Sequence, residues 1–461
     1  MRWKSAINPR LVATAVVALG GLLIYLINYP GSMEFDSFVQ LVEARSQQYS
    51  NWHPAILSWM LGVFDTLPGP IAAWFTGLDM ALVFGALIAV LWLPKRVSWL
   101  AVAAAAVMLV LPQFVLTQAV LWKDAMFANV VLAAFVSMAF LERCGWSGRA
   151  VLLAASAVLL TMAVLLRENG AVVVPFAVVA VVVILWGNRR TAWLCGGVLL
   201  VVVTVLAVAT NAVLQLRADT YDGRQEKLKV FQYYDIVGMV HRDPAVRVTI
   251  LDREAPATAH LLHTQSVKRW SPVKNDTLLT VEMAAALEDT PAPVIQRQWL
   301  QSIKDHPWDY LATRAVLFRW VFQAPDVWKC HPFHVGDEGD PNDLRELGMH
   351  ERMNARDEML KDYGYAFKPG PAYSHGLYAL IALGVMVLLL RRREAADIAV
   401  SALISSSFLF ASTFLIVSIA CDYRYLYLVD LSALAGVLYV AADWRDLLQK
   451  KRGPEGPLGS V

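Results

Sequence analysis

The chain has 461 residues, of which 57% are hydrophobic and 17% are charged. Ordinary globular domains carry about 25% charged residues, so this composition excludes a soluble globular protein and indicates a membrane protein with many spans. The formal net charge is +2, and the cations stand in short clusters between apolar runs. That distribution argues against a nucleic-acid-binding protein.

The first apolar run follows three basic residues and resembles a signal peptide. The sequence around Asn28 and Tyr29 offers no small-residue cleavage site, so we expect an uncleaved first helix. Further runs come close to the length that a hydrocarbon core of about 30 Å requires. Together they predict about ten spans, at roughly 11–28, 71–93, 97–111, 125–141, 150–166, 171–186, 192–214, 373–390, 396–419 and 425–442.

The apolar segment 55–67 is shorter, at about 13 residues, and ends at a Pro-Gly-Pro break. A segment of that length is expected to lie in the membrane interface or to re-enter. If it does not cross, the basic clusters all fall on the side of the N-terminus, as the positive-inside rule requires for the cytoplasm. These clusters are Lys95-Arg96, Arg143 with Arg149, Arg189-Arg190, Arg391-Arg392-Arg393, and the tail with Arg445, Lys450, Lys451 and Arg452.

The sequence therefore predicts an all-α polytopic membrane protein with a mostly helical outer domain. Its expected parts are an N-terminal membrane domain at 1–215, an extracytoplasmic domain at 216–372, and C-terminal membrane helices with a cytoplasmic tail at 373–461. One helix is expected from about Val294 to Trp320, either at the membrane surface or packed within the outer domain. Cys330 and Cys421 would share the outer compartment, and the sequence leaves a disulfide between them open.

The same topology places the polar motifs together on the outer side. Glu34 and Asp36 stand two residues apart after the first span, close enough to bind a divalent metal together or for one to act as a general base. The alternative interpretation is an N-cap and a solvated acid for a helix that starts near Ser37. His53 could orient a carboxylate, bind a metal or hydrogen-bond a sugar hydroxyl, and an interfacial histidine satisfied by backbone is equally common.

Three cations also fall on this side, Lys123, Arg167 and Arg424. A cation at the outer membrane surface is costly, and phosphate recognition is a physical reason to retain it. Lys123 and Arg167 each stand next to an acidic residue, so a local ion pair is the alternative explanation for these two, whereas Arg424 is flanked by Tyr423 and Tyr425.

These motifs resemble the GT-C superfamily of integral membrane glycosyltransferases, in its bacterial, polyprenyl-phosphate-sugar-dependent type. The resemblance rests on the many-spanning layout, the E-x-D triplet in the first outer loop, the short segment after it and the large late outer domain. It covers most of the membrane half, from Tyr29 to Tyr425, and the outer insert only loosely. The matching residues are Asp36, His53-Pro54, Lys123-Asp124, Arg167-Glu168-Asn169-Gly170 and Arg424-Tyr425.

The resemblance implies transfer of a sugar from a polyprenyl-phosphate-linked donor to a hydroxyl of an envelope glycan, lipid or surface protein. Transfer would occur on the extracytoplasmic face of the bacterial cytoplasmic (inner) membrane, with both termini cytoplasmic and no nucleic-acid partner. Asp36 would be the general base, and Glu34 and His53 would orient it or hold a divalent metal ion. The implied phosphate-binding residues are Lys123, Arg167 and Arg424, supported by Asp124, Glu168, Asn169, Asp422 and Tyr425.

Two other functions fit an outer face rich in acids and bases. One is a flippase or transporter of lipid-linked sugars, although inverted repeats and broken helices with midplane polar residues are not evident. The other is an envelope oligosaccharide ligase or polymerase, which would not require the E-x-D triplet.

Overall fold

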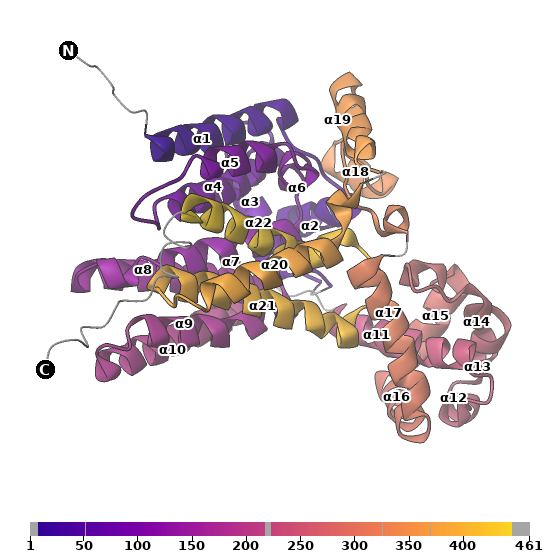
Figure 1. Cartoon of the computed structure of the whole chain (residues 1–461). Coiled ribbons are helices and arrows are strands. Elements are labelled where there is room, and N and C mark those ends of the chain that lie inside the picture. The colour runs from indigo at the N-terminus through magenta and orange to yellow at the C-terminus, as the bar shows by residue number, and fades with distance from the viewer. Residues whose placement is uncertain (1–7, 51, 217–222, 325, 369, 445–461) are drawn as a thin grey trace, which may run out of the picture.

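The structure, a computed structural model, describes residues 8–50, 52–216, 223–324, 326–368 and 370–444. Within these ranges the chain is largely helical, with isolated β-bridges and no strand. Figure 1 shows one bundle of roughly aligned helices with a smaller helical group at one end. The bundle helices are α1 Pro9–Asn28, α4 Ile71–Leu91, α5 Leu100–Leu109, α7 Lys123–Met138, α8 Trp146–Leu166, α9 Val174–Ile184, α10 Arg189–Gln215, α20 His375–Leu389, α21 Ala395–Val417 and α22 Tyr427–Ala442.

The described residues contain seven helices long and apolar enough to cross a membrane. The count is eight if α5 and the segment Pro112–Ala119, which comprises α6 (Pro112–Val115) and a 3-10 turn, form one span bent by 62°. The sequences of α9 and α20 are also apolar, but these helices are shorter. The predicted count of about ten is therefore not confirmed, although each predicted run contains a helix. Helix α3, Ala55–Asp65, has 11 residues, or about 16 Å at 1.5 Å per residue, which is too short to cross.

The described basic clusters gather at one end of the bundle. Arg10 on α1 donates to the carbonyl oxygen of Lys95 at 3.0 Å, and Arg143 donates to that of Trp92 at 3.0 Å. Arg392 hydrogen-bonds side chains of both α21 and α22. This clustering is the arrangement that the charge pattern predicts for a cytoplasmic end. The termini and the basic residues 445–452 lie outside the described residues.

The insert between α10 and α20 contributes the smaller helical group (Figure 1). Buried side chains of this group form a second hydrophobic core that includes Tyr233, Ile236, Leu251, Ile295 and Leu317. The predicted boundaries at 216 and 372 stay a prediction, and 217–222 lie outside the described residues. The helices of the group are α11 Gly223–Arg242, α12 Thr249–Glu254, α13 Pro256–Leu261, α14 Val267–Arg269, α15 Val281–Asp289, α16 Ala292–Asp305 and α17 Pro307–Gln323.

The prediction of one helix from Val294 to Trp320 is wrong, because the chain breaks between α16 and α17. His306 has φ −131° and ψ 57°, since the ring of Pro307 disfavours a helical conformation of the preceding residue. Ile295 and Leu317 from the two helices enter the second core. On α17, Arg314 is fully buried and ion-paired with Asp235 at 2.5 Å, so the two helices pack within the insert.

The last part of the insert returns to the bundle. Helix α18 (Pro341–Leu347) contacts α2 (Phe35–Ser46), and α19 (Ala355–Ala366) follows it. A disulfide joins Cys330 to Cys421. The sequence alone leaves open whether these two cysteines pair. Disulfides persist in oxidising compartments, so this bond fits an extracytoplasmic position for the insert and for the loop before α22.

Candidate functional site

The loop between α1 and α2 is held by backbone hydrogen bonds on two sides. Toward the bundle, Ser32 N–H donates to Ala119 at 2.8 Å and Leu121 N–H donates to Ser32 at 3.0 Å. Toward the insert, Met33 N–H donates to Gly336 at 3.1 Å. The first outer loop therefore bridges the membrane helices and the insert, and its acidic residues start from a fixed backbone.

An arginine of the insert fastens the same loop. Arg352 forms a bidentate ion pair with Asp337, in which Nε lies 2.7 Å from Oδ2. Arg352 also donates a hydrogen bond to the carbonyl oxygen of Gly31. Gly31 has φ 111°, and a Cβ there would lie 2.7 Å from Cγ2 of Thr76, so glycine is required. Sequence reasoning missed Arg352 and Asp337, since their segment of the insert carries no motif.

Glu34 and Asp36 both turn toward one guanidinium. Glu34 occupies the N-cap position of α2, but its side chain forms no capping hydrogen bond and instead contacts Nη1 of Arg424. Asp36, in the first helical turn, accepts a hydrogen bond from Nη2 of Arg424 at 3.0 Å. The alternative of an N-cap and a solvated acid is met only in position: Glu34 stands at the N-cap of α2, which begins at Phe35, and Asp36 is 31% exposed, but both carboxylates are ion-paired with Arg424.

Arg424 gathers two further acids from the membrane half. It lies in a 3-10 turn, Tyr423–Leu426, with Nε 2.8 Å from Asp422 and 3.6 Å from Asp124. Its guanidinium stands over the ring of Trp122 at 5.4 Å, which favours a cation. Burial, followed by the negative charges of Asp124 and Asp36, raises the pKa of Asp422 well above its usual value.

A buried polar cluster fixes the turn that carries Arg424. The Tyr423 hydroxyl accepts a hydrogen bond from Gln113 at 2.8 Å and contacts Asp430. Asp430 in turn lies 2.8 Å from Nδ1 of His375 on α20. Because these side chains are all buried, each needs its partner, and the orientation of the turn is tightly specified.

Arg167 lies in an aromatic enclosure. It is ion-paired with Asp124, and its guanidinium faces the rings of Phe410, Phe414 and Tyr425 at 5.3–5.8 Å. The nearby Asn169 donates to Thr413 of α21 at 2.7 Å. Arg167 and Arg424 thus share Asp124 as a common acidic neighbour.

Lys123 and Glu168 do not pair with the oppositely charged residues next to them in sequence. Lys123 is the first residue of α7 and is half-buried; among the described residues it has no ion-pair or hydrogen-bond partner. Glu168 is paired with Lys227 of the insert, with Nζ 2.7 Å from Oε1, and not with the adjacent Arg167. Lys227 also donates to the carbonyl oxygen of Trp52 at 3.3 Å. The expected ion pair between Arg167 and Glu168 is therefore absent, and Glu168 instead pairs with Lys227, which is distant in sequence.

His53 lies beside the predicted base without touching it. Its Nε2 is 4.0 Å from Oδ1 of Asp36, and its buried Nδ1 has no hydrogen-bond partner. Burial lowers the pKa of His53 to about 4, helped by Lys123 and opposed by Asp36. The imidazole is consequently neutral at pH 7, and the 4.0 Å gap leaves room for a small polar group between it and Asp36.

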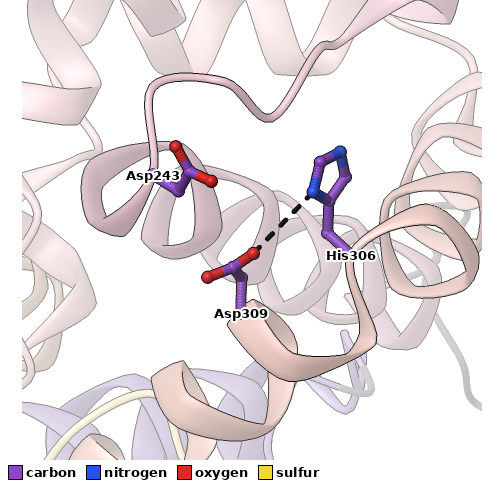
Figure 2. Close-up of side chains that lie close together, drawn as sticks. All are labelled: Asp243, His306 and Asp309. Carbon is purple, nitrogen blue, oxygen red and sulfur yellow. Dashed lines mark ion pairs between the residues drawn. The ribbon is translucent and has the colours of Figure 1, made fainter.

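Glu34, Asp36 and His53 are the residues predicted to hold a metal ion. Among the described residues, their ligand atoms do not lie close enough together to share one ion. Arg424 occupies the space between the two carboxylates instead. The three-residue cluster that does meet this geometry is Asp243, His306 and Asp309 in the insert, shown in Figure 2.

A cavity of about 490 Å³ opens next to His53, between α3, α8 and α10. Its polar lining includes His53, Glu168 and Arg224, and its apolar lining includes Val164 and Ala207. A cavity with a polar part and an apolar wall suits a ligand that has a charged head and a hydrocarbon tail. Arg224 belongs to the insert and is not part of a sequence motif, so its position at this cavity could be seen only in the folded structure.

No protein-family model matches the chain, and no curated protein matches it. Among solved structures, it is similar to the oligosaccharyltransferase AglB from Archaeoglobus fulgidus in complex with an inhibitory peptide and a dolichol-phosphate, with a TM-score of 0.41 and 14% identity over 98% of this chain and 52% of that one. The apo form of the Archaeoglobus fulgidus oligosaccharyltransferase gives a TM-score of 0.40 and 13% identity, over 95% and 51% of the two chains. The chain thus spans about half the length of these proteins, and likeness at this level does not define a family.

Proposed function

We propose that the chain is a GT-C type membrane glycosyltransferase that moves a sugar from a polyprenyl-phosphate-linked donor to an acceptor hydroxyl in the envelope of a bacterium. The observation that carries the proposal is the position of Asp36. Its carboxylate is oriented by Arg424, remains 31% exposed, and lies 4.0 Å from the neutral His53, which lines the amphipathic cavity. An accessible, oriented carboxylate beside such a cavity suits a general base that acts on a lipid-linked substrate.

Each site residue then has its own task. Asp36 accepts the proton of the acceptor hydroxyl as that oxygen attacks the anomeric carbon, and His53 hydrogen-bonds the same hydroxyl or the sugar. Arg424 positions Asp36 and Glu34, since its guanidinium is already occupied by carboxylates. Lys123, free of a carboxylate partner among the described residues, stabilises the donor phosphate as it leaves.

The cavity supports a lipid-linked donor. Its apolar wall, from α8 and α10, would receive the first units of the polyprenyl chain, and Arg224 would face the phosphate at the polar end. Arg167, enclosed by three aromatic rings and bound to Asp124, would hold that acid and the Arg424 turn in place. The active site would face the extracytoplasmic side, which is the side opposite the basic clusters.

The test is Asp36→Asn, with Asp65→Asn as the matched control. Both carboxylates are ion-paired with an arginine and are exposed to a similar degree, 31% and 27%, but Asp65 lies away from the site. A bacterial strain that lacks the chain is complemented with each variant, and its envelope glycans and surface proteins are analysed by mass spectrometry. Removal of a general base typically costs about 10²–10⁴-fold in rate.

We expect Asp36→Asn to leave the sugar modification missing while the protein level is normal, and Asp65→Asn to restore it. The asparagine still accepts the hydrogen bond from Arg424, so the fold is preserved. Restoration of the modification by Asp36→Asn at the wild-type level would remove Asp36 as the base. If the strain without the chain accumulates the lipid-linked sugar on the cytoplasmic face instead, the flippase alternative holds.

A further inference from the structure

Three side chains with metal-ligand chemistry meet in the insert, away from the glycosyl-transfer site. Asp243 directly follows α11, His306 directly precedes α17, and Asp309 stands in the first turn of α17. One ligand atom from each lies within 4.8 Å of the others. Figure 2 shows that the three side chains point into one shared space.

The backbone around the cluster is fixed by hydrogen bonds. The Asp243 N–H donates to Met239 at 2.9 Å, and the His306 N–H donates to Ser302 at 2.9 Å. Asp243 Oδ1 accepts from the N–H of Ala245 at 2.9 Å, which orients the carboxylate and leaves Oδ2 available. The cluster is therefore presented by two helix ends, so little backbone ordering would be needed on binding.

The two carboxylates have little cationic compensation. Nε of Arg242 is 3.6 Å from Asp309, and the arginine side chain is 49% exposed. His306 Nδ1 is 3.7 Å from Oδ2 of Asp309, longer than a hydrogen bond. Partly exposed pairs at such separations contribute little to stability, so these contacts do not explain why two acids and an imidazole converge on one space.

We propose that Asp243, His306 and Asp309 bind a divalent transition metal of the zinc class and thereby fasten α11 to α17. One imidazole and two carboxylates are a ligand set for Zn²⁺ or Mn²⁺, whereas Mg²⁺ and Ca²⁺ prefer oxygen ligands throughout. Metal–ligand distances of about 2.0–2.2 Å require ligand atoms roughly 3.4 Å apart. Rotation of the partly exposed side chains closes the present spacing, and water completes the coordination.

The helix that the ion would fasten leads to the glycosyl-transfer site. On α17, Arg314 binds Asp235 of α11 and donates to the carbonyl oxygen of Ser418 at 2.6 Å. Ser418 stands three residues before the disulfide-bonded Cys421 in the loop that leads to the Arg424 turn. The ion would therefore stabilise the helix pair that supports this loop, and it takes no part in the transfer chemistry.

The experiment uses the full chain, purified in detergent through a tag without histidine and stripped with a chelator. Zinc alone is then titrated, with bound metal measured by mass spectrometry and affinity by calorimetry. The variants are His306→Gln, the double variant Asp243→Asn with Asp309→Asn, and the control His260→Ala, an exposed histidine on α13. The thermal midpoint of each protein without metal reports folding.

We expect one zinc ion per chain in the wild type and in the control, with a raised thermal midpoint. His306→Gln and the double variant should lose at least tenfold in affinity and lose the zinc-dependent rise, while their metal-free midpoints stay near that of the wild type. Unchanged zinc binding in either variant would overturn the assignment, as would absence of binding to the wild type at micromolar zinc. Equal stabilisation by Mg²⁺ would overturn the zinc-class selectivity.

Discussion

Replacement of Arg424 by lysine is expected to destabilise the protein although the charge is retained. The arginine side chain is 10% exposed and meets Glu34, Asp36 and Asp422 through three different nitrogens. Lysine presents a single ammonium group and cannot match this planar fork. It can satisfy one of these acids well and leaves the others with a weakened or missing partner.

The magnitude follows from the contacts that are lost. Hydrogen bonds to charged groups contribute about 1.5–3 kcal/mol each, so loss of two contacts to Arg424 costs about 3–6 kcal/mol. The side chain of Arg424 is 10% exposed whereas that of Arg45 is 39% exposed, so water screens the contacts of Arg424 less; the 31% exposure of Asp36 places the expected cost at the lower end of this range. The matched control is Arg45→Lys, because Arg45 forms a two-pronged pair with Asp65 whose side chains are 39% and 27% exposed. Pairs of that kind contribute about 0.2–1 kcal/mol.

Both variants are purified in the same detergent and unfolded by heat and by denaturant. The midpoint of Arg424→Lys should fall clearly below that of Arg45→Lys, and the envelope modification should be lost in the Arg424 variant alone. Equal midpoints for the two variants would refute the view that Arg424 organises the acids of the site.

Two further predictions concern the same region. Reduction of the Cys330–Cys421 disulfide should cost about 2–5 kcal/mol of stability, read as a lower thermal midpoint in reductant; a variant with serine at both positions should not respond, and an equal response would contradict this account. The pKa of His53 is about 4 in the folded protein and 6.5 in the unfolded chain. The unfolded chain therefore takes up a proton first as the pH falls, so the stability of the fold is unaffected by His53 above pH 6.5 and decreases between pH 6.5 and 4. The total loss in the free energy of unfolding is about 3 kcal/mol. His53→Gln should flatten the acid side of the midpoint-against-pH curve, and parallel curves would count against a buried, neutral His53.

Several features of the site could be predicted from the sequence because they depend on residues that are close together along the chain. Glu34 and Asp36 follow a long apolar run, and the positions of the basic clusters indicate which end of the bundle faces the cytoplasm. Those patterns place Lys123, Arg167 and Arg424 on one side together with the acids. They do not say which cation contacts which acid, because spacing along the chain carries no information about packing between distant segments.

The sequence by itself determined that this is an all-helical membrane protein, because its apolar composition and the lengths of its hydrophobic runs follow directly from the chain. Only the tertiary structure decided that Arg424 binds Glu34 and Asp36, that Glu168 pairs with Lys227, and which segments of the insert fasten the first loop. The physical reason is that hydrophobic periodicity acts within a helix, whereas ion pairs form between whichever charged groups the packed helices bring within a few ångströms of one another.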